Sequence, residues 1–102
     1  MKGDLVKDVF FGFVGLHILH SAQNKPVYGA AIREELRRHG YQLSFGTLYP
    51  LFHRLERKGL LQSELQLSSG RIRRLYSITQ LGNMMLAEGK LKAKELLLAL
   101  EQ

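Results

Sequence analysis

Cysteine is absent from this chain of 102 residues, which excludes disulfides, thiolate metal sites and cysteine nucleophiles. A membrane-spanning run is also lacking: residues 9–19 are apolar except for His17, only about half the length that a bilayer requires. Asp4 and Asp8 precede this run and no small-residue cleavage site follows it, which argues against a signal peptide. We therefore expect a cytoplasmic protein without a membrane partner.

Patterns typical of catalysis are missing as well. Gly12 and Gly15 stand inside the apolar run and do not form a glycine-rich phosphate loop. Most of the nine carboxylates stand beside basic residues, as solvated surface charges do. His17 and His20 lie three residues apart, but with only Asp8 nearby they are more typical of a subunit contact than of a metal site. We expect no enzyme, no metal and no other cofactor.

Acidic residues are few relative to basic ones. Fifteen Lys and Arg face nine Asp and Glu, a net charge of +6. Residues 33–74 hold nine basic and four acidic residues, so +5 of this charge lies in the centre of the chain and not in a tail. This distribution favours a polyanionic partner, with nucleic acid as the first candidate.

Two apolar faces are predicted for a first helix over residues 5–20. The first face is formed by Val6, Val9, Phe10, Phe13, Leu16 and His20, and the second by Phe11, Val14 and Ile18. A helix that is apolar nearly all round needs cover on both sides. In a chain this short, a partner subunit is expected to supply one of them.

A second helix is predicted over residues 28–39. Tyr28, Ile32 and Leu36 fall four residues apart and form its apolar face. Gly40 stands where a C-terminal cap is expected.

A third helix is predicted over residues 45–58, with Ser44 as its N-cap and Gly59 at its end. Pro50 complicates this prediction, because proline removes a backbone donor and clashes with the preceding helical turn. Either the helix begins later, near Gly46, or its first turn is irregular.

The hydrophobic period then changes to two. Residues 61–65 and 75–78 alternate between apolar and polar, and the turn-forming residues 68–71 lie between them, which predicts a β-hairpin. Arg71, Arg73 and Arg74 stand at or just past its tip.

A last helix is predicted from the cap residue Thr79 to about Leu100. Met84, Leu91 and Leu98 recur every seven residues along it. So much hydrocarbon on a terminal helix has no cover in a small monomer. We expect residues 79–102 to form a dimerisation helix.

Three helices followed by a basic hairpin describe a winged helix-turn-helix, a mainly α fold with one small β-hairpin. In such a fold the third helix enters the major groove of double-stranded DNA, and the hairpin wing reaches the backbone or the minor groove. Residues 1–78 would form this DNA-binding domain. The predicted DNA-contacting residues are Ser44, Thr47, Tyr49, His53, Arg54, Arg57, Arg71, Arg73 and Arg74.

Two segments resemble the PadR family of bacterial and archaeal transcriptional regulators. Residues 44–51, Ser-Phe-Gly-Thr-Leu-Tyr-Pro-Leu, with residues 54–56 and 59–60, are similar to the recognition-helix signature of that family. Residues 70–79 and Gly82 are similar to its wing and the entry to its last helix.

The chain departs from the family pattern at three places. Residues 28–32 read Tyr-Gly-Ala-Ala-Ile where the family often has His-Gly-Tyr-x-Ile. Ile72 stands where proline is frequent, and Leu75 stands where an aromatic residue is frequent. None of these changes removes a charge needed for DNA.

The resemblance implies a homodimeric repressor whose subunits pair through the last helix with help from the first, on a pseudo-palindromic operator. The interface residues expected on this basis are Phe10, Phe13, His17, Met84, Leu91 and Leu98. Relatives bind planar or hydrophobic compounds at the dimer interface, where Phe10, Phe11 and Phe13 could line a space. Core packing is the favoured role for these phenylalanines, and the chain lacks the tryptophans with which drug-binding relatives stack their ligands.

A second class of function uses the same fold. A winged helix can bind protein instead of DNA, but such a module has little need for arginines gathered on one face. Salt separates the two classes, because phosphate contacts weaken steeply as salt rises and apolar protein contacts do not.

Overall fold

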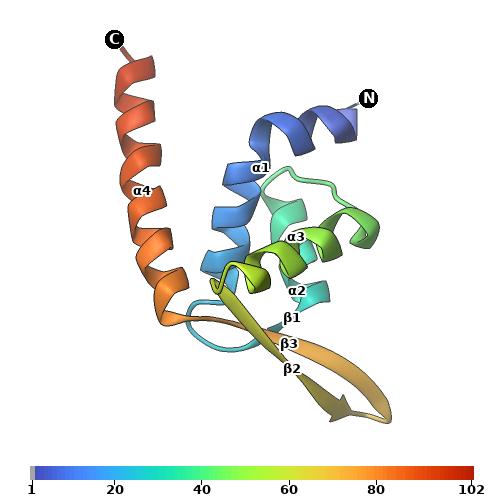
Figure 1. The fold of residues 1–102 in the computed structure, drawn as a ribbon. Helices are drawn as coiled ribbons and strands as arrows, with labels where there is room; N and C mark the ends of the chain where they lie inside the picture. Colours follow the sequence, from blue (N-terminus) through green and yellow to red (C-terminus); the bar gives the residue numbers. More distant parts are fainter. Residues whose placement is uncertain (1) are drawn as a thin grey trace.

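Four helices and a three-stranded antiparallel sheet form the fold in a computed structural model, which describes the backbone of residues 2–102 and the side chains of residues 8–102. The elements are α1 (Lys2–Ser21), β1 (Val27–Tyr28), α2 (Gly29–Arg38), α3 (Phe45–Arg57), β2 (Leu61–Ser68), β3 (Arg71–Ile78) and α4 (Gln80–Leu100). The β2–β3 ribbon projects from a body made of α1, α2 and α3, and α4 rises beside α1 in the opposite direction (Figure 1). This architecture confirms the predicted winged helix-turn-helix with a C-terminal helix.

The core lies where α1, α2 and α3 meet. Its fully buried side chains are Val14, Ile18, Ile32, Leu36, Leu48 and Phe52. The second predicted face of α1 is therefore the one that packs into the chain's own core. Each of these large aliphatic or aromatic groups contributes about 1.5–3 kcal/mol when it leaves water.

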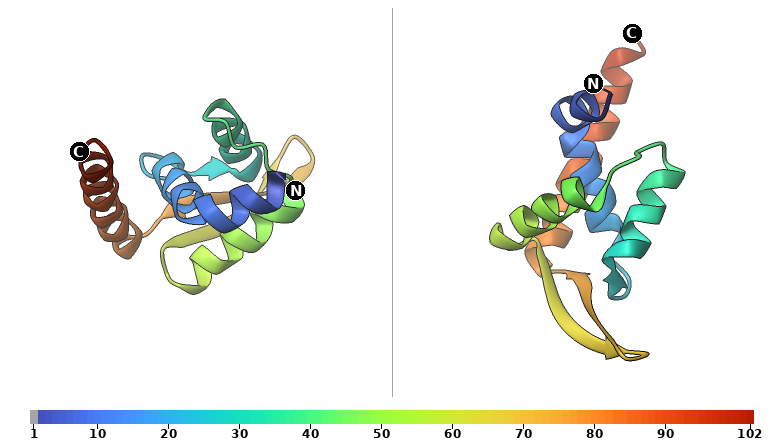
Figure 2. Two further views of the ribbon diagram at one scale, coloured as in Figure 1. Left: turned by 90° about the horizontal axis from the view of Figure 1, so that it is seen from above. Right: turned by 90° about the vertical axis from the view of Figure 1, so that its right-hand side faces the viewer.

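Part of the first predicted face of α1 is exposed: Val9, Phe10 and Phe13 lie on the surface, although each is large and apolar. Leu16 of the same face packs against α4 at Gly89, and the side chain of Val6 lies outside the described residues. α1 lies between α2 and α4 when the molecule is seen from above (Figure 2). No helix in the described part of the chain is long and apolar enough to cross a membrane.

Glycines end both helices of the helix-turn-helix. Gly40 and Gly59 have φ of +92° and +77°, so that each helix closes with a left-handed residue after its cap. The following residue then donates back into the helix: Tyr41 N to Leu36 O at 2.9 Å, and Leu60 N to Leu55 O at 2.9 Å. Both stops were expected from the sequence.

The start of α3 answers the question raised by Pro50. The helix begins at Phe45, and Pro50 lies inside it. Its first turn is tightened, because the Ser44 carbonyl accepts from both Thr47 N at 3.1 Å and Leu48 N at 3.0 Å. Of the two alternatives, the irregular first turn is therefore correct, and the helix does not begin late.

The wing is a hairpin with a two-residue turn. Ser69 and Gly70 both have positive φ, 51° and 75°, the conformation of a turn that matches the twist of paired strands. Pairing runs from Leu61 opposite Ile78 to Ser68 opposite Arg71.

β1 was not predicted. Its two residues pair with β3, Val27 opposite Tyr76 and Tyr28 opposite Leu75, so α2 begins at Gly29 and not at Tyr28. Two residues are too few to show an alternating pattern, which explains why the sequence did not reveal the strand.

Candidate nucleic-acid interface

A hollow of about 540 Å³ separates α3 from the wing. Tyr49 and His53 line it from α3, and Arg71, Arg73 and Arg74 line it from β3. No carboxylate is found among its described lining residues. The structure therefore gathers five of the nine predicted DNA-contacting residues around one space.

The exposed face of α3 presents Tyr49, His53 and Arg57 on one side of the helix. The Tyr49 ring stacks on Phe45, with 5.3 Å between ring centroids. Arg33 of α2 also contacts Phe45: its guanidinium lies 4.8 Å from the centroid of that ring, and its Nε donates to Leu43 O at 2.9 Å. Arg33 thus connects α2 to the loop before α3 and to the first residue of α3.

Ser44 and Thr47 form the N-cap of α3. The Ser44 hydroxyl oxygen accepts from Thr47 N at 3.2 Å, and the same hydroxyl donates to Thr47 Oγ1 at 3.3 Å. Ser44 is exposed and Thr47 is half-buried, so a helix N-terminus with its partial positive charge is open to a phosphate.

Arg73 rests on an aromatic ring of β1. Its guanidinium lies 4.7 Å from the centroid of Tyr28, and the Tyr28 hydroxyl donates to Gln66 Oε1 at 3.0 Å. Tyr28 therefore contacts both strands of the wing, and it restrains the direction of Arg73.

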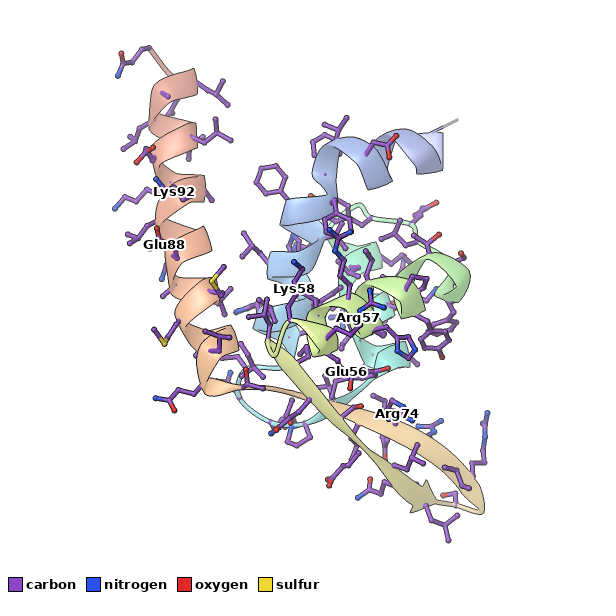
Figure 3. The ribbon with its side chains drawn as sticks, viewed as in Figure 1. Glu56, Arg57, Lys58, Arg74, Glu88 and Lys92 are labelled. Atoms are coloured by element: carbon purple, nitrogen blue, oxygen red, sulfur yellow. The ribbon has the colours of Figure 1, made fainter. Side chains whose placement is uncertain are left out.

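Arg74 points to the other face of β3. Its Nη1 donates to Ser63 Oγ at 3.0 Å, and the Ser63 hydroxyl donates to Glu56 Oε2 at 2.7 Å. Figure 3 shows Glu56 on α3 beside the base of the wing, on the side from which Arg74 extends. Burial raises the pKa of the Tyr76 hydroxyl in this region, and the Glu56 carboxylate raises it further.

Arg54 lies on a different side of α3. Its guanidinium is 5.1 Å from the centroid of Phe11 in α1, so it is not brought into the hollow with Tyr49 and His53. Arg57 and Lys58 stand at the end of α3 nearest the base of the wing (Figure 3). These residues flank the hollow without lining it.

The acidic residues of α2 are paired within that helix. Glu34 meets Arg37 at 2.6 Å and Glu35 meets Arg38 at 3.3 Å. The hydrogen bond from Arg37 lowers the pKa of Glu34, which is exposed. With these pairs on α2, four of the five surplus positive charges of residues 33–74 lie on α3 with its C-cap Lys58 and on the wing, and Arg33 of α2 carries the fifth.

Tyr28, Arg33 and Gln66 carry no signal in the sequence that links them to this interface. The spacing of apolar residues places Tyr28 on the apolar face of the second predicted helix and gives Arg33 and Gln66 no role in binding. Only contacts between segments distant in the sequence show that Tyr28 and Arg33 hold parts of the interface in place.

The predicted stripe of α4 faces away from the chain. Met84 and Leu91 are each 63% exposed and Leu98 is 56% exposed. The side that meets the body carries Gly82 and Gly89, which lie close to Leu60 and Leu16. The stripe is therefore free to meet another surface.

His17, expected at the dimer interface, packs within its own chain. Its ring stacks on His39 at 4.7 Å and meets the edge of Tyr41 at 5.3 Å. Burial lowers the pKa of His17, and the neighbouring His39 and His20 lower it further. Among the described residues, no group of three or more histidine or acidic side chains is placed to hold a metal ion.

Two of the three phenylalanines considered for an effector line a second hollow. This groove, of about 620 Å³, lies between α1 and α4, and Phe11 and Phe13 contribute to its walls. Phe10 does not line it; its ring lies 6.1 Å from Phe13 and 6.5 Å from Tyr41.

Comparison with known proteins identifies the family. Residues 18–88, which include α2, α3 and the whole wing, match the family described as the transcriptional regulator PadR-like family. The chain belongs to the PadR family. The Mycobacterium tuberculosis transcriptional regulator Rv3488 is 51% identical over 83 residues, covering 81% of this chain and 78% of that protein.

Solved structures of PadR proteins share the fold over nearly the whole chain. The PadR-like transcription factor from Bacteroides fragilis superimposes with a TM-score of 0.80 at 28% identity, covering 96% of both chains. The PadR family regulator from Eggerthella lenta gives a TM-score of 0.82 at 31% identity, covering 96% of this chain and 87% of the other. The chain is a DNA-binding transcriptional regulator and not an enzyme, as its sequence predicted.

Proposed function

We propose that this PadR protein is a homodimeric repressor that binds a pseudo-palindromic operator through α3 and the wing. One observation carries the proposal: the hollow between α3 and the wing is lined by Tyr49, His53 and three arginines, with no carboxylate among its described walls. Such a surface is complementary to a polyanion that carries both phosphates and readable base edges.

Side chains at different places in the structure would contact different parts of the DNA. Thr47, Tyr49, His53 and Arg57 would face the major groove, where hydroxyl and guanidinium groups can bond phosphates or bases. Arg71, Arg73 and Arg74 would meet the backbone or the adjacent minor groove. Ser44 and Arg54, on the flanks of α3, would contact phosphates.

Dimerisation would place the two copies of α3 about one DNA turn apart, roughly 34–36 Å. The exposed stripe of Met84, Leu91 and Leu98 supports pairing through α4, and exposed Phe10 and Phe13 support a contribution from α1. In this arrangement residues 1–78 bind DNA and residues 79–102 dimerise, and the regulator acts in the cytoplasm on chromosomal DNA.

A small hydrophobic effector would bind in the groove between α1 and α4. The groove is lined mainly by apolar side chains, including Val9, Phe13 and Leu96. Because it lies next to the proposed dimer surface, a compound bound there would alter the spacing of the two copies of α3 and release the operator.

The first experiment is selection of bound duplexes from a random DNA pool at near-physiological salt, followed by sequencing. We expect enrichment of a pseudo-palindrome with half-sites about one turn apart. Enrichment of no sequence, with only weak and salt-sensitive retention, would favour the protein-binding module instead. A reporter placed behind the selected operator then tests repression: expression rises on deletion of the regulator if it is a repressor.

A further inference from the structure

One face of the wing is apolar far beyond the point where the core ends. The strand register places Leu65, Leu67 and Ile72 on the same face as Arg74, since side chains alternate along each strand. We call Leu65, Leu67 and Ile72 the apolar wing face. Leu65 is 61% exposed, and Leu67 and Ile72 are each 72% exposed.

The same face is buried only at the base of the wing. There Leu61 and Tyr76 belong to the core, whereas no described residue from outside the wing covers the outer half of this face of the ribbon. Leu67 lies six residues beyond Leu61, about 20 Å farther along the strand. The opposite face of β2 is polar, with Gln62, Glu64 and Gln66.

An exposed apolar ribbon is a hazard unless a partner covers it, because such a surface promotes association between chains. A second copy joined through α1 and α4 would not cover it, since the wing extends from the other end of the molecule (Figures 1 and 2). The occupant must therefore reach the wing from the side of α3.

The charges around the apolar wing face point to a polyanion. Arg71 stands beside it at the turn, Arg74 lies on it, and Arg73 lies on the reverse side of the same strand. Glu64, the acidic residue of the described wing strands, is on the reverse side. Leu65, Ile72 and Arg74 also line the hollow with Tyr49 and His53, so the apolar wing face continues the proposed DNA surface.

We propose that the apolar wing face packs against the sugars and base edges of the DNA minor groove beside each half-site, and selects A·T pairs there. Deoxyribose rings line that groove, and apolar side chains are known to enter it and widen it. A G·C pair places the guanine amino group in the minor groove, where an aliphatic side chain cannot bond it. The inference rests on the proposed operator binding.

The turn end of the wing has a geometry suited to inserting a stiff edge into the minor groove. Leu67 and Ile72 are directly opposite each other next to the turn, so their side chains support one another across the strands. The two-residue turn at Ser69 and Gly70 keeps this end of the ribbon narrow. Tyr28 restrains the ribbon through Gln66 and Arg73.

The test compares the wild-type protein with the double variant Leu67→Thr/Ile72→Thr on the selected operator. Threonine retains strand propensity, so the wing is expected to form, and equal thermal unfolding midpoints check this. We expect affinity to fall about tenfold, because apolar contacts are lost. The slope of log K against log salt should stay unchanged, since no phosphate contact is removed. Gln62→Thr, on the polar face of β2, is the matched control and should bind like the wild type.

A second arm changes the DNA. Each A·T pair in and beside the half-site is replaced by G·C and then by inosine·C, which has the major-groove edge of G·C without its minor-groove amino group. At the base pairs whose minor groove contacts the wing, we expect G·C to weaken binding of the wild type and inosine·C to restore it. The double variant should be indifferent to the same exchanges.

The outcomes separate this inference from the function on which it rests. If the wild type selects no operator, both are overturned. If the wild type binds and the double variant binds equally well, only the role of the apolar wing face is overturned. The role of the apolar wing face is also overturned if the salt slope of the double variant differs from that of the wild type, because the face would then act only by placing the arginines. It is likewise overturned if inosine·C binds better than G·C at none of the positions, because the minor-groove amino group would then have no effect.

Discussion

Arg73 and Arg74 are neighbours in the sequence but have different surroundings. Arg73 lies over the Tyr28 ring on one face of β3, and Arg74 is bound through Ser63 to Glu56 on the other. A guanidinium that rests on an aromatic ring keeps its N–H donors available for phosphate, since it has no acceptor of its own to satisfy. Compared with Arg74, Arg73 therefore has the guanidinium that is more available for a phosphate contact.

Replacing Arg73 with alanine should weaken operator binding across sequences and reduce the slope of log K against log salt by about one. Arg73→Lys keeps the charge and should keep the slope. Lys25→Ala, in the exposed loop before β1 and outside the hollow, is the charge-matched control. The measurement is fluorescence anisotropy over a salt series, and an unchanged slope for Arg73→Ala would remove this residue from the phosphate contacts.

His17 is a second residue with an unusual setting. It faces His39 and Tyr41, and His20 lies one turn along α1. Glu35 of α2 acts on its charge, and Lys90 of α4 lines, together with His17, a hollow of about 560 Å³ between α1 and α4. Burial and the two histidines favour the neutral ring, and together they outweigh Glu35, so the pKa of His17 is lowered from its ordinary value of 6.5.

We expect the free energy of unfolding to fall as pH drops through the range just below 6.5. In that range the unfolded chain binds a proton at His17 that the folded chain does not, so stability rises with pH. Urea unfolding of the wild type and of His17→Gln, at equal protein concentration between about pH 7.5 and about pH 5, measures the difference. The variant should lose less stability on acidification, and identical pH profiles would contradict this assignment.

At the scale of the elements, the placement of α4 depends on two glycines one heptad apart. A Cβ at Gly82 would overlap the carbonyl oxygen of Leu60 and lie 2.7 Å from Cγ1 of Ile78. A Cβ at Gly89 would meet only the methyl end of Leu16. The start of α4 is therefore packed directly on the backbone of Leu60, between α3 and β2, whereas its middle is packed on a side chain that can move.

Gly82→Ala should destabilise the protein by about 1–2 kcal/mol, because the backbone of Leu60 cannot move away and overpacking outweighs the better helix propensity. Gly89→Ala is the matched control on the same helix. There a gain of about 1 kcal/mol in helix propensity offsets a rotamer change of Leu16, so the net change should be close to zero. Urea unfolding compares the two, and equal effects would show that α4 is not held at Gly82.

At the scale of the whole molecule, the proposed DNA-binding surface and the proposed dimer surface lie at opposite ends. The wing and α3 present the arginine-rich hollow, whereas α4 and the N-terminal half of α1 rise away from it (Figure 1). Two apolar surfaces are exposed at this second end: the α4 stripe with Met84 and Leu91, and the α1 face with Val9 and Phe13. Because each is large and uncovered in one chain, pairing of two chains is the arrangement that removes them from water.

Leu91→Asp/Leu98→Asp should give monomers and lose most operator affinity, since two carboxylates cannot be buried in an apolar contact. Leu91→Met/Leu98→Met conserves volume and apolar character, so it should remain dimeric and bind normally. Sedimentation at micromolar concentration measures the state of each variant. A dimer that persists in the aspartate variant would place the interface elsewhere.

The helices and the wing could be predicted because they depend on residues that are close together in the sequence. The spacing of Ile32, Leu36 and Leu48, the cap at Ser44 and the glycine stops determine the helices within a few residues, and the period of two determines the wing. At Pro50 such local patterns were not enough to predict where α3 begins. Propensity alone left two alternatives for α3, and the contacts of Leu48 and Phe52 with the core show which one the chain adopts.

The order of amino acids alone predicts the four helices, the basic hairpin, the PadR resemblance and the DNA-binding role, because periodicity, capping and charge are properties of contiguous residues. Which side chains meet follows only from the packing in three dimensions: Arg73 with Tyr28, Arg74 with Glu56 through Ser63, Arg54 with Phe11, and His17 with His39. Each of these contacts joins segments that are far apart in the chain. The packing of α1, α2, α3 and the wing on one core brings them together, and no local pattern records it.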